Sequence, residues 1–166
     1  MEQYQLTRFG IDGLALVDAP EPVPGPRDVV VRWPVWSLNS RDLLLVEGHL
    51  APDLPLPFTP VSDAAGEVVS VGNEVTAWRS GNRVVSHFFI DWQDGEGTPK
   101  RRTASLGYSL PGLLAEYSML PERALVPLPS HLSYAEGAAP DCWSHREECA
   151  VSDSSRCAPA WKHCAA

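Results

Sequence analysis

Sixteen prolines in a chain of 166 residues are the feature that most restricts its fold. Many stand between short apolar runs, in the clusters Pro20–Pro26 and Pro52–Pro60. Proline has no amide hydrogen and ends helices and central strands, so each cluster predicts a loop. The sequence therefore favours short strands joined by proline-rich loops over long helices.

The apolar runs between these loops predict a mainly β fold. Runs rich in valine and aromatic residues are typical of strands. The predicted strands are Tyr4–Phe9, Gly13–Val17, Asp28–Trp33, Ala65–Val71, Arg83–Phe89, Leu113–Leu120 and Ala124–Pro127. Two short helices are expected, one capped by Asn39 with Asp42 in its first turn and one begun by the capping box Ser133–Glu136. Short strands with little helix indicate a β-barrel-like domain.

The last 27 residues, 140–166, differ in composition from the rest. They hold all four cysteines, Cys142, Cys149, Cys157 and Cys164, and contain no Leu, Ile, Phe, Met or Gly. One interpretation is a metal or disulfide module, but the spacing C-x6-C-x7-C-x6-C lacks the close cysteine pairs of common zinc sites. Without an apolar period the segment has no face to bury, so we favour a disordered or irregular tail after a domain of residues 1–139.

Charge restricts the possible partners. The net charge is −8, which disfavours nucleic acid and anionic membranes because both require a basic face. The single basic run, Lys100–Arg102, is too short to change this balance. No apolar run approaches the ~20 residues that span a bilayer, and the first residues show no signal-peptide pattern. We expect a cytoplasmic protein.

Several short motifs occur in one order along residues 22–139. They are PVPGPRDVVV from Pro22, SLNSRDL from Ser37, PVSDAAGEVV from Pro60, VGNEV from Val71, SGNRV from Ser80, GLLAEY from Gly112 and LSYAEGAA from Leu132. In this order and spacing the chain resembles the medium-chain dehydrogenase/reductase superfamily, in its zinc-independent alcohol dehydrogenase and quinone oxidoreductase branch. The resemblance implies a GroES-like, partly open β-barrel as the N-terminal domain, and a small-molecule substrate as the partner. It also implies a second, Rossmann domain that binds NAD(P).

The resemblance also bears on zinc. Zinc-using relatives have Cys where this chain has Asn39, His where it has Ser62, and Glu where it has Asp63. A zinc site takes three or four N, S or O ligands, so one carboxylate does not make a site. The structural zinc lobe of those relatives needs four thiolates in the loop after Phe89, and this loop has no cysteine. We therefore predict no metal.

Without zinc, hydrogen bonds or charge must polarise a carbonyl substrate. The resemblance places Asn39, Arg41 and Asp42 at the catalytic edge, and Asn39 and Ser40 beside the nicotinamide. The alternative is that Asn39 and Asp42 only cap a helix, which capping preference alone would explain.

Four further residues are candidates for substrate binding. Asp63 either lines the same cleft or is an ordinary turn residue. Phe88, Phe89 and Trp92 either form an apolar wall or are strand and core aromatics. They adjoin the long polar loop Asp91–Pro111, and a loop of that length is usually functional or mobile.

The resemblance breaks after Ala139. A G-x-G-x-x-G fingerprint is absent, and so is the alternation of strands and helices that would hold it. The segment that begins at Pro140 can be encoded by codons that, when read one nucleotide later, give Pro-Thr-Ala-Gly-Leu-Thr-Ala. This is the sequence with which members of the family continue at this point. We therefore expect a frameshift at this point and a truncated oxidoreductase, inactive without its Rossmann domain. The alternative is a non-catalytic interaction module that associates with full-length relatives or with itself through the exposed inter-domain face.

Overall fold

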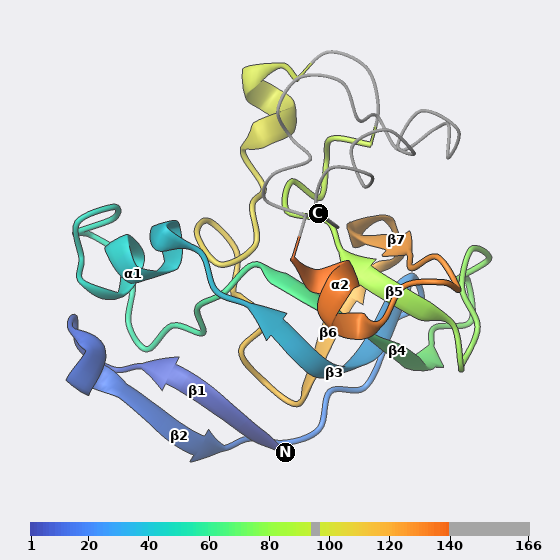
Figure 1. The fold of residues 1–166 in the computed structure, drawn as a ribbon, viewed down its shortest axis with the longest axis horizontal. Helices are drawn as coiled ribbons and strands as arrows, with labels where there is room; N and C mark the ends of the chain where they lie inside the picture. The colour runs from blue at the N-terminus through green and yellow to red at the C-terminus, as the bar shows by residue number, and fades with distance from the viewer. Residues whose placement is uncertain (94–96, 140–166) are drawn as a thin grey trace.

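A five-stranded antiparallel sheet forms the centre of the computed structural model, which describes residues 1–93 and 97–139. The strand order is β6-β3-β4-β5-β7. These strands are β3 (Asp28–Ser37), β4 (Asp63–Val71), β5 (Arg83–Ser86), β6 (Tyr117–Pro121) and β7 (Leu125–Pro127). A separate ribbon of β1 (Glu2–Leu6) and β2 (Leu14–Asp18) lies along one side of the sheet (Figure 1). In the described residues β6 and β7 each pair with one strand of the sheet, so the sheet is open.

Two short helices accompany the sheet: α1 (Ser40–Val46), which follows β3, and α2 (Tyr134–Ala138), which packs on β3 and β4 (Figure 1). The capping box predicted for α2 is present: the Ser133 hydroxyl accepts from the Glu136 amide, and the Glu136 carboxylate accepts from the Ser133 amide at 2.8 Å. Three 3-10 turns complete the described ranges, at Ile11–Gly13, Pro99–Arg102 and Glu122–Ala124. No helix in these ranges is both long and apolar enough to cross a membrane.

The core gathers around β3. Val29, Val31 and Trp33 alternate along this strand, and each is at most 2% exposed. Alternating side chains of a strand share one face, so these three point into the same core layer. Val68 of β4 and Val84 of β5 complete the centre of that layer and are fully buried.

One strand boundary predicted from the sequence is wrong in an informative way. Strand β3 does not end before Pro34 but continues to Ser37. The register shifts from the pair Arg32 and Glu67 to the pair Val35 and Ala65, so β3 holds one extra residue there. Proline is tolerated at such a bulge. Opposite the bulge, a Cβ on Gly66 would lie 2.1 Å from the Arg32 carbonyl oxygen, so this position requires glycine.

The other predicted strands are present with smaller changes in their bounds. The mainly β fold with short helices is confirmed. The strand predicted over Arg83–Phe89 ends at Ser86, and the one predicted over Leu113–Leu120 begins at Tyr117. The irregular tail predicted for residues 140–166 lies outside the described residues.

Candidate functional site

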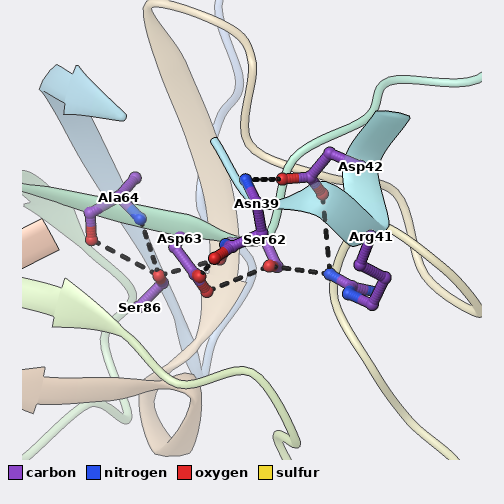
Figure 2. A network of polar contacts seen from close by, with 7 residues as sticks. All are labelled: Asn39, Arg41, Asp42, Ser62, Asp63, Ala64 and Ser86. Atoms are coloured by element: carbon purple, nitrogen blue, oxygen red, sulfur yellow. Dashed lines mark hydrogen bonds and ion pairs between the residues drawn. The ribbon is translucent and has the colours of Figure 1, made fainter. Parts of the chain in front are cut away.

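A network of polar side chains forms where β3 ends and β4 begins (Figure 2). The two strands are antiparallel neighbours, and Ser37 pairs with Asp63 in their register. The chain leaves β3 at Ser37 and reaches the N-cap of α1 at Asn39 two residues later. Strand pairing therefore brings Asn39 beside Asp63, although 24 positions separate them in the sequence.

Asp63 is the centre of this network. The Asn39 side-chain amide donates to Asp63 Oδ2, and Ser62 Oγ donates to Asp63 Oδ1 at 2.9 Å. Arg41 Nη2 donates to Ser62 Oγ at 2.8 Å. Asp63 is fully buried, and burial raises the pKa of its carboxyl, while the hydrogen bonds from Ser62 and Asn39 act in the opposite direction.

Asp42 has a capping role. Its carboxylate accepts from the Asn39 backbone amide at 2.8 Å, as the sequence alternative anticipated. Its second oxygen, Oδ1, lies 3.6 Å from Arg41 Nη2. Asp42 is 5% exposed, and burial raises the pKa of its carboxyl, opposed by the Asn39 amide and the Arg41 charge. Asp42 therefore holds the start of α1 and positions the backbone of Asn39.

The aromatic residues extend outward from Arg41. Its guanidinium lies over the ring of Phe88, with 4.3 Å between the guanidinium carbon and the ring centroid. Phe88 is buried, whereas Phe89 and Trp92 are half-buried. The strand pattern expected at these positions is wrong because β5 ends before them, at Ser86. Phe88 thus packs against the guanidinium of Arg41. The alternation of side chains along a strand did not predict this contact.

Of the eight predicted site residues, the structure brings five into one cluster, joins Phe89 and Trp92 to that cluster through Phe88, and leaves Ser40 apart. Asn39, Arg41, Asp42, Asp63 and Phe88 form one connected cluster. Ser40 is exposed on the first turn of α1 and lies outside the network drawn in Figure 2. The catalytic, substrate-binding and cofactor-binding roles assigned to these residues stay predictions.

Two serines of the network were not predicted as site residues. Ser62 joins Arg41 to Asp63, and Ser86 fixes the backbone beneath them. Ser86 Oγ donates to the Ser62 carbonyl at 2.9 Å and accepts from the Ala64 amide at 3.0 Å. These contacts of Arg41 and Ser86 join residues 21 or more positions apart in the sequence, so no local pattern offers a signal for them.

The segment before Asp63 has an unusual backbone. Val61 has a φ of 74°, in the left-handed region that β-branched residues rarely adopt. Its carbonyl accepts from the Leu113 amide at 2.8 Å. A Cβ on Gly112 would lie 2.2 Å from the Pro60 carbonyl oxygen, so the passing chain needs glycine there. These contacts hold the turn that directs Ser62 and Asp63 toward α1.

The donor set of the cluster bears on metal binding. The three positions at which the resemblance places zinc ligands, Asn39, Ser62 and Asp63, do lie together. They supply an amide, a hydroxyl and one carboxylate, which differ from the thiolate and imidazole ligands that zinc favours. Across residues 1–93 and 97–139, no three His, Cys, Asp or Glu side chains gather closely enough to hold a metal ion.

The sequence of this chain is similar to a known protein family and to curated proteins. Residues 25–130 match the family described as "Alcohol dehydrogenase GroES-like domain". A zinc-type alcohol dehydrogenase-like protein of Schizosaccharomyces pombe is 38% identical over 70% of this chain and 34% of its own length. A chloroplastic quinone-oxidoreductase of Triphysaria versicolor is 35% identical over 82% of this chain and 36% of its own.

A solved structure agrees with these matches. The crystal structure of an NAD-dependent alcohol dehydrogenase superposes with a TM-score of 0.73 at 32% identity, over 83% of this chain and 42% of that one. The chain spans about a third of the length of the two curated relatives. By its sequence match and its fold, the chain belongs to the medium-chain dehydrogenase/reductase superfamily, as an alcohol dehydrogenase GroES-like domain.

Proposed function

We propose that this domain forms the substrate-side wall of a zinc-independent, NAD(P)-dependent oxidoreductase. The reaction class is transfer of a hydride between the nicotinamide and an alcohol or aldehyde, a quinone or an enone. The observation that carries the proposal is the cluster of Asn39, Arg41 and Asp63. In it an amide stands at one of the positions that carry metal ligands in zinc-using relatives, and the Arg41 guanidinium binds the hydroxyl at another, Ser62.

The two donors of the cluster suit a carbonyl substrate. When a hydride adds to a carbonyl carbon, negative charge develops on the oxygen, and preorganised donors stabilise that charge. Arg41 and Asn39 each carry N–H groups beyond the ones that bind Ser62 and Asp63. Asp63 accepts from Asn39 and so fixes which way the amide points. In this proposal Arg41 and Asn39 bind the oxygen, and Asp63 and Asp42 orient them.

The charge of Arg41 supports a site without zinc. Its guanidinium donates to Ser62 Oγ at 2.8 Å, and Ser62 stands where zinc-using relatives have a histidine ligand. A cation fixed at that distance repels a divalent ion that would bind the same oxygen. A positive charge at this position polarises the substrate oxygen as a metal would, so Arg41 replaces the electrostatic effect of the zinc.

The cofactor requires a different kind of structure. Dinucleotides bind at the carboxyl ends of parallel strands, against the N-terminus of a helix. The sheet pairs of the described residues are antiparallel. We therefore propose that this domain does not hold NAD(P) by itself and is inactive alone, and that the nicotinamide reaches the site past the exposed Ser40.

A second candidate function is supported by exposed leucines around α1. Leu38 is 73% exposed, Leu43 46% and Leu44 44%, close to the polar cluster. Such apolar side chains favour contact with another protein surface. In this alternative the domain is an interaction module that associates with itself or with full-length relatives through the α1 face.

A domain graft tests the main proposal. Residues 1–139 are joined to the cofactor-binding domain of the NAD-dependent alcohol dehydrogenase relative, and NAD(P)H oxidation is measured with an aldehyde and a quinone. We expect chelator-resistant activity that falls about 10²-fold in Arg41→Met, the usual loss for one oxyanion donor. The exposed Arg32→Met variant is the matched control and keeps full activity. Full activity in Arg41→Met, or activity that depends on added zinc, would refute the proposal.

A further inference from the structure

We propose that Trp92 and Arg102 are positioning residues that set the orientation of Arg41 through the rings of Phe88 and Phe89. The proposal rests on the function assigned to Arg41 above. We call the three rings of Phe88, Phe89 and Trp92 the ring ladder. It links the site to the 3-10 turn Pro99–Arg102 in the long polar loop.

Four successive contacts make up this connection. The Arg41 guanidinium lies 4.3 Å from the Phe88 ring centroid, and the centroids of Phe88 and Phe89 are 4.3 Å apart. The Phe89 and Trp92 centroids are 6.1 Å apart, and the Arg102 guanidinium lies 5.1 Å from Trp92. The two cation–π distances and the distance between Phe89 and Trp92 fall within the ranges in which such pairs attract each other, and the rings of Phe88 and Phe89 are in direct contact. The contacts therefore run without a break from an exposed arginine to the buried site.

Arg41 depends on the ring ladder because few hydrogen bonds fix it. Nη2 donates to Ser62 Oγ, but the buried Nε has no hydrogen-bond partner within the described part of the chain. Its nearest carboxylate oxygen, in Asp42, is 3.6 Å away. One hydrogen bond allows a planar guanidinium to rotate about that bond, whereas a ring stacked against its face restricts the rotation. The plane of Arg41 is thus set by Phe88.

The outer end of the ring ladder is anchored. The Trp92 carbonyl accepts from His87 Nε2 at 2.5 Å, and the Trp92 amide donates to the Phe89 carbonyl at 2.9 Å. A Cβ on Gly97 would lie 2.5 Å from Arg102 Nη2 and 2.9 Å from the Trp92 ring, so the chain passes directly against both. A change of the loop at Arg102 or Gly97 therefore moves Trp92, and through it the other rings.

The test observes Arg41 directly and needs no cofactor. In the 166-residue chain with isotope-labelled arginine, the Nε–H resonance of Arg41 is identified by its loss in Arg41→Lys. Because this Nε is buried, its proton exchanges slowly enough to be observed. We expect Arg102→Met to shift this resonance, and Phe88→Leu to shift it further. Gly97→Ala, which displaces Arg102 without removing its charge, is expected to shift it as well.

The control is Lys100→Met, which removes one exposed positive charge from the same turn. We expect it to leave the Arg41 resonance in place. An unmoved resonance in both Arg102→Met and Gly97→Ala would overturn the proposal, and so would an equal shift in Lys100→Met, since the effect would then be one of charge alone. The two proposals can fail separately. If the domain graft keeps full activity in Arg41→Met, the proposed function is refuted. If Arg102→Met still shifts the Arg41 resonance in that case, the link between Arg102 and Arg41 through the ring ladder is supported.

Discussion

The side-chain amide of Asn39 donates a hydrogen bond to the carboxylate of Asp63, and this contact joins the start of α1 to the start of β4. Asn39 is also the N-cap of α1, and its backbone amide donates to Asp42. One residue thus connects a helix cap to a buried carboxylate. The start of α1, the start of β4 and the hydrogen bonds between them therefore position Asn39 and Asp63 relative to each other.

The first prediction concerns pH. Burial raises the pKa of Asp63 above its ordinary value of 3.8, so the folded state binds this proton more tightly than the unfolded state does. The associated stability is present below that value and is lost as pH rises through the folded pKa. We expect the unfolding free energy of wild type relative to Asp63→Asn to fall across this interval, as measured by urea titrations at a series of pH values.

The exposed Asp53→Asn variant is the control for a simple loss of charge, and its stability should follow wild type across the same pH series. If wild type instead gains stability over Asp63→Asn as pH rises, then Arg41 and the donors to Asp63 outweigh burial. In that case the pKa of Asp63 would be lowered in the folded state, and the prediction would be wrong.

The second prediction concerns the backbone at Val61. Alanine is normally about 0.5–1 kcal/mol better than glycine inside regular structure, because glycine loses more chain entropy. A left-handed φ reverses this order, since it costs a residue with a Cβ about 1–2 kcal/mol. With a φ of 74° at position 61, we expect Val61→Gly to be more stable than Val61→Ala in urea unfolding. At Val69, a partly exposed position in β4, the usual order should hold, and the usual order at both sites would contradict the prediction.

The third prediction concerns zinc. The experiment uses a chain in which the four cysteines of residues 140–166 are replaced by serine. Added zinc should leave its unfolding temperature unchanged. Asn39→Cys, Ser62→His and Asp63→Glu together restore the ligand types of zinc-using relatives, and zinc should stabilise that variant more strongly when Arg41→Met is added. A clear rise in unfolding temperature with zinc in the unmodified site would show that Arg41 does not exclude the metal.

The fourth prediction concerns the exposed α1 face. If Leu38 and Leu44 form a contact surface, the purified chain should show concentration-dependent association by light scattering. Replacing both leucines by glutamine should reduce the association, because apolar area is removed from the surface. Val23→Gln is the control, since Val23 is 80% exposed and lies in the loop between β2 and β3. Equal effects of the control and the double variant would contradict the prediction, because the association would then not depend on the α1 face.

The parts of the fold that could be predicted from sequence are those set by local chemistry. The valine-rich run from Asp28 indicates a strand, and the Ser133–Glu136 capping box marks a helix start, because both signals lie within a few residues. The end of β3 was missed, since a bulge that accommodates Pro34 depends on the partner strand and on Gly66.

The candidate site also has a part that the sequence could predict and a part that it could not. The resemblance drew attention to Asn39, Arg41 and Asp63, but the contacts between them depend on strand register. Ser62 and Ser86 were missed because their hydrogen bonds cross between β4 and β5 or reach Arg41, far away in sequence. The stacking of Arg41 on Phe88 joins α1 to the chain after β5, which no local pattern encodes.

The central claim is that this domain supplies the substrate side of the reaction and that NAD(P) is held elsewhere. The most direct measurement is the unfolding temperature of the 166-residue chain over a range of NADH and NADPH concentrations. A ligand that binds the folded state must raise this temperature, by an amount that grows with its concentration. We predict no shift with either dinucleotide. A saturable rise with one of them would contradict the claim, because it would show a dinucleotide site within this chain.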